Sequence, residues 1–272
     1  MEKEQQARKY SPAMHGVQIM GKRGRLFSVI YTAGGEKPRP TVLLLHGIPG
    51  NEQNMDLAQE LRRNGFHVIT FHYSGCFGSD GNYALSHNIE DANTVLDYIC
   101  SDIQYGFDKE RIFVVGHSIG GFVASHLSAL RQEIKGAAVL MPCNIGRIFK
   151  IQEESPRAAE KLLDILEESA KWLQGASIEK FLDELKSNSE RFRLENLAQS
   201  LAQKPFLCIE AEFDEHTPPQ YHCRPLEEAI YAIPGNRLRV VRLATDHLAS
   251  DCRLELCDNV VSYINDLNKE CF

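Results

Sequence analysis

Apolar residues occur along the chain in short runs, separated by stretches whose apolar positions have helical spacing. Seven runs are long enough for one buried strand each, and they cover residues 26–33, 41–46, 66–73, 111–116, 136–142, 205–211 and 237–243. Apolar positions three and four apart predict helices over residues 54–64, 119–131, 221–232 and 250–268, and one that starts at an Asn88 N-cap. Strands that alternate with helices indicate an α/β fold, with a mostly parallel sheet covered on both faces.

The alternation is interrupted once. Residues 144–204 carry two apolar stripes with helical spacing and no strand pattern. We therefore predict a core of residues 1–143 and 205–272, with residues 144–204 inserted as a helical cap. Ligands bind open α/β sheets at the carboxyl ends of the strands, so the cap should cover the site. Three of its aromatic residues are the candidates for the pocket lining: Phe149, Trp172 and Phe181.

The strongest chemical signal is GHSIGG (116–121), which lies between a predicted buried strand and an amphipathic helix. The pattern G-x-S-x-G in this context is typical of a tight turn that exposes a serine nucleophile, here Ser118. Glycine is needed at positions 116 and 120 because a side chain there would collide with the neighbouring backbone. The start of the following helix favours negative charge next to the serine.

A serine nucleophile needs a base, and in this arrangement the chain order is serine, acid, histidine. Four histidines follow Ser118: His126, His216, His222 and His247. His126 lies on the apolar face of a helix, and His216 and His222 fall in the loop region expected for the acid. His247 directly follows the last predicted strand, so we predict that it is the base.

The acid should follow the strand at 205–211, where Glu210, Glu212 and Asp214 compete. Glu210 lies within the strand and Glu212 comes too early, so Asp214 is favoured. Asp246 is a rival, but a residue adjacent to His247 rarely reaches the ring nitrogens of that histidine.

The loop HGIPG (46–50) follows a predicted buried strand. It can supply the backbone N–H of Ile48 as one donor to an oxyanion, and the N–H of Ile119 can supply the other. His46 is a pocket candidate that we expect to shape this loop and not to act as a base.

Composition restricts the partners. The net charge is −7 and the pI is about 5.8, which argues against nucleic acid as a partner. The apolar runs are too short to span a membrane, and the polar start MEKEQQARKY lacks a signal-peptide core. The eight cysteines show no CxxC pair, so we expect no metal site and free thiols in a reducing cytoplasm.

The motifs LLLHGIPG, FHYSGCFGSDG, GHSIGG, EAEFDEHTPP and TDHL resemble the α/β-hydrolase superfamily, within it the serine aminopeptidase-like hydrolases. The stretch GSDGNYALSHNIEDANTVLDYI is similar to bacterial cinnamoyl and feruloyl esterases. The resemblance implies a triad of Ser118, Asp214 and His247, and no cofactor. Thr217 stands where the family has valine. Cys76 stands where it usually has histidine, which makes Cys76 a further pocket candidate.

These observations predict a serine hydrolase, specifically a carboxylesterase that acts on small acyl or aryl esters. An amidase or peptidase, or an acyl-thioesterase, would use the same triad. A non-catalytic scaffold is disfavoured because all three members are present in the right order. The sequence assigns no physiological substrate, and it leaves a homodimer open.

Overall fold

A computed structural model describes residues 11–36 and 38–271 of the chain. Residues 1–10, where the sequence predicts no signal peptide, lie outside the described residues. Within the described ranges, no helix is both long enough and apolar enough to cross a bilayer.

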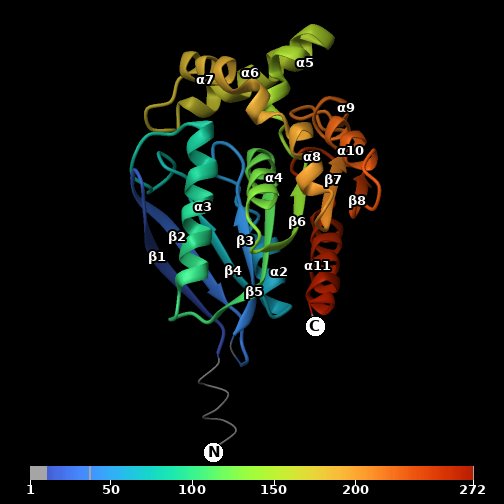
Figure 1. Cartoon of the computed structure of the whole chain (residues 1–272). Coiled ribbons are helices and arrows are strands. Elements are labelled where there is room, and N and C mark those ends of the chain that lie inside the picture. Colours follow the sequence, from blue (N-terminus) through green and yellow to red (C-terminus); the bar gives the residue numbers. More distant parts are fainter. Residues whose placement is uncertain (1–10, 37, 272) are drawn as a thin grey trace, which may run out of the picture.

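The centre of the molecule is an eight-stranded sheet in the described part of the chain (Figure 1). The strands are β1 (Ala13–Gly21), β2 (Gly24–Thr32), β3 (Arg39–Leu45), β4 (His67–Phe71), β5 (Phe107–His117), β6 (Ile134–Leu140), β7 (Phe206–Ala211) and β8 (Leu238–Leu243). Their order across the sheet is β1-β2-β4-β3-β5-β6-β7-β8. β2 is antiparallel to both of its neighbours, and the other pairs are parallel.

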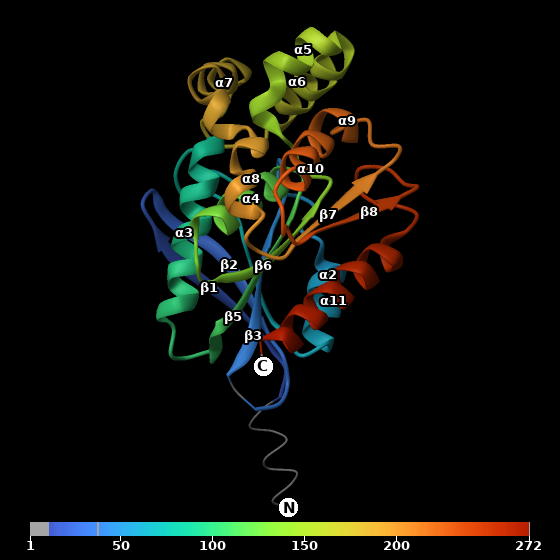
Figure 2. The same cartoon turned by 45° about the vertical axis from the view of Figure 1, so that its right-hand side comes forward.

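Helices cover both faces of this sheet, as predicted (Figures 1 and 2). The core helices are α2 (Met55–Arg63), α3 (Leu85–Ser101), α4 (Ile119–Leu130), α9 (Pro219–His222), α10 (Arg224–Tyr231) and α11 (Arg253–Glu270). Along β3, Leu43 packs with the apolar residues of α3 and α4, whereas Leu44 packs with those of α2 and α11. Alternate residues of a strand point to opposite faces, so a strand buried on both sides must be apolar throughout.

The insertion between β6 and β7 is helical and lies above the carboxyl ends of the parallel strands (Figures 1 and 2). It consists of η1 (Ile145–Arg147), α5 (Ile148–Glu154), α6 (Pro156–Ala170), α7 (Ile178–Phe192), η2 (Leu194–Leu197) and α8 (Ala198–Leu201). The Glu184 carboxylate of α7 accepts hydrogen bonds from the backbone N–H groups of Leu85 and Ser86, each at 2.8 Å. The insertion is therefore attached to the core at the first turn of α3.

Two local predictions were wrong. No strand is predicted before residue 26, but β1 pairs with β2 in a hairpin, and Ile19 is the one buried residue of this edge strand. Asn88 is not an N-cap: α3 begins three residues earlier, and the Asn88 amide donates to the Tyr83 hydroxyl at 2.7 Å. A distant carboxylate from α7 satisfies the first N–H groups of α3, so the local cap signal has no effect.

Candidate active site

Ser118 occupies the turn between β5 and α4, with φ 57° and ψ −120°. This conformation is rare for a residue with a side chain and costs about 1–3 kcal/mol, which the surrounding packing must offset. A Cβ on Gly116 would lie 2.0 Å from the Gly120 carbonyl oxygen, and one on Gly120 would lie 2.2 Å from the Leu45 carbonyl oxygen. Both glycines of the motif are therefore required because backbone approaches them closely.

His247 and Asp214 form a buried hydrogen-bonded pair, with 2.7 Å between Nδ1 and Oδ2. The rival acids are engaged elsewhere. Asp246 accepts hydrogen bonds from the backbone N–H groups of its own loop, and Glu210 pairs with Arg242 at 2.8 Å. Glu212 is exposed at the surface. The geometry thus places Asp214, among the candidates considered, beside the predicted base.

The Asp214 carboxylate receives four hydrogen bonds in a site that is 5% exposed. Its Oδ1 accepts from the backbone N–H groups of His216 and Thr217, each at 2.8 Å. Burial alone would raise the pKa of Asp214, but the hydrogen bond and charge of His247, together with the bonds from Thr217, lower it to about 2. Asp214 therefore stays ionised at neutral pH.

Thr217 is a functional candidate whose role the sequence did not show. Its hydroxyl lies 2.8 Å from Asp214 Oδ2, 3.2 Å from His247 Nδ1 and 3.2 Å from the Met141 carbonyl oxygen. The side chain is 2% exposed. A valine at this position, as the resemblance implies, would fill the same space but could make none of these contacts.

His117 is a second residue that the sequence did not single out. Its Nε2 lies 2.8 Å from the His247 carbonyl oxygen, and the two rings are 4.8 Å apart. Burial is the main reason that the pKa of His117 is lowered to about 3, so the ring is neutral and can donate one N–H to that carbonyl. His117 thereby connects the end of β5 to the loop that carries His247.

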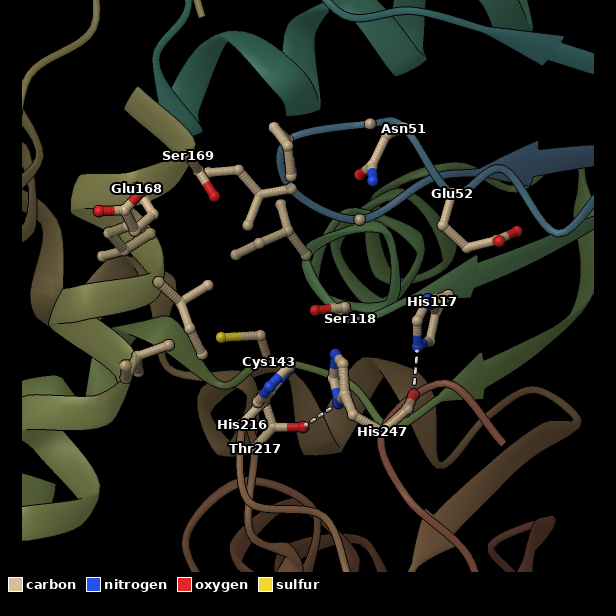
Figure 3. Close-up of a pocket in the computed structure, with 18 of the residues that line it drawn as sticks. Asn51, Glu52, His117, Ser118, Cys143, Glu168, Ser169, His216, Thr217 and His247 are labelled. Atoms are coloured by element: carbon tan, nitrogen blue, oxygen red, sulfur yellow. Dashed lines mark hydrogen bonds between the residues drawn. The ribbon is translucent and has the colours of Figure 1, made fainter. Parts of the chain in front are cut away.

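Ser118 and His247 line the same pocket, and Figure 3 shows both side chains directed into it. Within the described residues, the Ser118 hydroxyl makes no hydrogen bond to His247. Such bonds are often long before a substrate is bound. Ile48 and Ile119 also line this pocket, and a Cβ on Gly47 would lie 3.0 Å from Ser118 Cβ. The loop after β3 therefore lies directly against the serine.

The pocket has a volume of about 380 Å³ and lies between the carboxyl edge of the sheet and α6. From the core it is lined by Gly47, Ile48, Pro49, Gly50, Asn51, Glu52, His117, Ser118, Ile119, Cys143, His216, Thr217, His247 and Leu248. From α6 it is lined by Leu162, Asp164, Ile165, Leu166, Glu168 and Ser169. The insertion therefore overhangs Ser118 and forms one wall of the pocket.

The three aromatic residues predicted to line the pocket do not line it. Trp172 is 67% exposed, just beyond the end of α6. Phe181 is buried against the core, where its ring meets that of Tyr83 edge-on at 5.9 Å. Phe149 packs against the core and is half-buried. An apolar stripe predicts that a helix face is buried, but it does not tell which surface lies beneath that face.

His46 and Cys76 lie behind the loop and not in the pocket. The His46 ring is buried, and its Nδ1 lies 2.6 Å from the Gly47 carbonyl oxygen. Burial and the nearby His72 lower the pKa of His46 to about 3. The Cys76 thiol donates to the Pro49 carbonyl oxygen at 3.6 Å, and burial raises its pKa. Both side chains therefore contact backbone carbonyl groups of the loop. Among the described residues, no group of three or more metal-binding side chains is found.

A family model for the alpha/beta hydrolase fold matches residues 40–187, which is more than half of the chain. The chain belongs to the alpha/beta hydrolase fold family. Acylamino-acid-releasing enzyme 1 of rice (Oryza sativa subsp. japonica) is 33% identical over 97 residues, which cover 33% of this chain and 12% of that protein. Epoxide hydrolase 3 of Xenopus tropicalis is 32% identical over 111 residues, which cover 40% of this chain and 29% of that protein. The matched stretches are therefore small parts of these relatives.

Solved structures of alpha/beta hydrolases match over most of the chain. Est1E from Butyrivibrio proteoclasticus, which has also been solved with ferulic acid bound, superposes with a TM-score of 0.68 at 15% identity. The match covers 93% of this chain and 99% of Est1E. The acylaminoacyl peptidase of Pyrococcus horikoshii gives a TM-score of 0.70 at 12% identity, and covers 94% of this chain and 41% of that one. At these identities the likeness concerns the fold.

Proposed function

We propose that this alpha/beta hydrolase is a serine hydrolase, specifically a carboxylesterase acting on small acyl or aryl esters. The observation that carries the proposal is the buried 2.7 Å hydrogen bond between Asp214 and His247, in a pocket that also contains Ser118 on its strained turn. The proposal assigns Ser118 as nucleophile, His247 as base and Asp214 as the acid that orients His247.

The reaction takes place in two steps. His247 Nε2 removes the Ser118 proton while Oγ bonds to the ester carbonyl carbon, and the resulting oxyanion accepts hydrogen bonds from the N–H groups of Ile48 and Ile119. His247 then gives its proton to the leaving alkoxide, which departs as an alcohol and leaves an acyl-serine. In the second step His247 deprotonates a water molecule, which attacks the acyl carbon, and Ser118 regains its proton as the acid is released.

The same residues would cleave an amide or a thioester, because the triad does not select the leaving group. An amide substrate is the second candidate, since acylamino-acid-releasing enzymes match in sequence and an acylaminoacyl peptidase matches in fold. An ester substrate is favoured here because small esterases match over nearly the whole of both chains. Matched p-nitrophenyl ester and p-nitroanilide substrates with the same acyl group distinguish the two candidates.

A fluorophosphonate probe tests the nucleophile. We expect one label on the wild-type protein, at Ser118, and we expect Ser118→Ala to lose both labelling and the hydrolysis of p-nitrophenyl butanoate. Ser101→Ala, which changes an exposed serine at the end of α3, is the matched control and should behave like the wild type. Labelling of Ser118→Ala at another serine would overturn the assignment.

The apolar residues over Ser118 predict a preference in acyl length. Leu162, Ile165 and Leu166 face the pocket from α6. Each buried methylene contributes about 0.8 kcal/mol, so two extra methylenes should raise kcat/KM about tenfold for butanoate over acetate. A flat profile or one that favours acetate would contradict an acyl pocket under α6.

We also propose that the protein works in a reducing cytoplasm. In support, its eight cysteines are free in the structure, and five of them are buried. Thiol titration of protein purified without reductant should count eight free thiols, and a disulfide that stabilises the protein would contradict the proposal.

A further inference from the structure

The face of α6 that covers Ser118 ends in a polar residue. Leu162, Ile165, Leu166 and Ser169 all line the pocket, and their spacing places them on one side of the helix. The rise from Leu162 to Ser169 is about 10 Å, which is long enough to follow a medium acyl chain. The first three residues form an apolar wall, and the fourth adds a hydroxyl at its end.

The Ser169 hydroxyl has no hydrogen-bond partner in the described part of the chain, but its oxygen is accessible to solvent in the pocket. The residue is 4% exposed, and within the described ranges its hydroxyl bonds to no other residue. Ser125 and Ser187 donate to the carbonyl four residues earlier, at 2.8 and 2.9 Å, whereas the Ser128 hydroxyl of α4 is enclosed without a partner among the described residues. Figure 3 shows the Ser169 hydroxyl directed into the pocket. Ser169 therefore differs from Ser128, because its hydroxyl can bond to a ligand or to water in the pocket.

Charge around the pocket limits what that ligand group can be. Three carboxylates line the pocket, those of Glu52, Asp164 and Glu168. Among the described residues that line it, none is a lysine or arginine. Glu168 is paired with Lys171, but Asp164 has no ion pair among the described residues, so a substrate carboxylate at this end would meet an unbalanced like charge. The group that bonds to Ser169 should therefore be neutral.

We propose that Ser169 is a specificity-determining residue that binds a neutral hydrogen-bonding group, such as a hydroxyl, at the far end of the acyl chain. The middle of the chain would lie against Leu162, Ile165 and Leu166, and its ester carbon would lie at Ser118. This inference rests on the esterase function proposed above and names the class of acyl group: an aliphatic chain with an apolar middle and a neutral polar end.

Three methyl esters with different chain ends test the inference. They are methyl heptanoate, methyl 6-hydroxyhexanoate and monomethyl adipate, which end in a methyl group, a hydroxyl and a carboxylate. Acid release in a pH-stat gives kcat/KM for each. A neutral hydrogen bond is worth roughly a fivefold change, so Ser169→Ala should lower the hydroxyl-to-methyl ratio about fivefold. Monomethyl adipate should be the slowest of the three, and Asp164→Asn together with Glu168→Gln should speed its hydrolysis.

Ser187→Ala is the matched control, because it removes an exposed serine hydroxyl from α7 outside the pocket and should leave all three values unchanged. Ser169→Thr keeps the hydroxyl and should keep the ratio within about twofold. If Ser118→Ala abolishes hydrolysis but Ser169→Ala leaves the ratio unchanged, this inference is wrong and the esterase proposal stands. If Ser118→Ala leaves hydrolysis intact, the esterase proposal fails, and the inference fails with it.

Discussion

Replacing Thr217 with valine tests whether the Thr217 hydroxyl, which contacts both Asp214 and His247, contributes to stability and activity. Valine has the same shape as threonine and is the residue that the family resemblance implies, so packing should be conserved. The change removes the hydroxyl that lies 2.8 Å from Asp214 Oδ2 and 3.2 Å from the Met141 carbonyl oxygen. The hydroxyl has one proton, and the shorter contact to a charged acceptor is the stronger of the two.

The size of the effect follows from what Asp214 retains. Its Oδ1 keeps two backbone N–H donors and its Oδ2 keeps His247, so one hydrogen bond in four is lost. A hydrogen bond to a charged group contributes roughly 1.5–3 kcal/mol, and the remaining donors should compensate part of it. We expect Thr217→Val to lower the free energy of unfolding by about 1–2 kcal/mol at pH 7, and to lower kcat/KM about tenfold because His247 is held less firmly.

The dependence on pH separates this account from simple loss of packing. The pKa of Asp214 is about 2 in the folded protein and 3.8 ordinarily, so its ionisation stabilises the fold above pH 3.8, and this stability is lost as the pH falls toward 2. In Thr217→Val the folded pKa should be higher and this contribution smaller. The stability gap from wild type should therefore be largest at pH 5–7 and shrink by pH 2–3.

Urea unfolding between pH 2 and pH 7 gives the stabilities, and kcat/KM for p-nitrophenyl butanoate gives the activities. Thr217→Ser, which keeps the hydroxyl and loses a methyl group, is the control and should keep activity within about threefold of wild type. A valine variant as active as wild type, with a stability gap that does not change with pH, would refute the reasoning.

Two further predictions concern backbone packing and buried charge. Gly120→Ala should prevent folding, seen as loss of soluble protein, because its Cβ would lie 2.2 Å from the Leu45 carbonyl oxygen. Gly16→Ala in β1, where a Cβ would meet nothing within 4 Å, is the control and should express normally. A folded Gly120→Ala variant would contradict the turn geometry. Burial and the charge of Glu210 raise the pKa of Glu227 from 4.5 to about 7, so this carboxyl lowers the stability of the fold progressively from pH 4.5 to 7 and by a constant amount above pH 7. Glu227→Gln should therefore stabilise the protein by up to about 3 kcal/mol at pH 9 and hardly at all at pH 4, and equal thermal shifts at both pH values would count against a raised pKa.

The strands and the serine turn could be predicted because their signals are local. A strand buried on both faces must be apolar throughout, as in β3. The turn at Ser118 requires glycine at positions 116 and 120, because a Cβ there would collide with backbone oxygens. β1 gave no such signal, because it is an edge strand whose residues are mostly exposed or half-buried. The pairing of Asp214 with His247 was predictable from chain order, since the ends of neighbouring parallel strands meet at one edge of the sheet.

The supporting contacts could not be predicted in the same way. Each of these contacts involves a single atom: the Thr217 hydroxyl contacts Asp214, and the His117 ring contacts the His247 carbonyl oxygen. The spacing of residues along the chain does not indicate either contact. The prediction of the pocket lining was wrong for a related reason. The placement of each helix decides which of its residues face the serine, and Trp172 lies beyond the end of α6 while Phe181 of α7 packs against Tyr83.

The position of the cap helices in turn depends on a contact between distant parts of the chain. Glu184 of α7 binds the first N–H groups of α3, where the helix dipole favours a negative charge. The same bond replaces the local cap expected from Asn88, and it holds the insertion over the carboxyl edge of the sheet. α6 packs against α7 and carries Ser169 into the pocket. The carboxylate that replaces the local cap of α3 therefore also helps to set which α6 residues line the pocket, so neither feature can be predicted from its own segment of sequence.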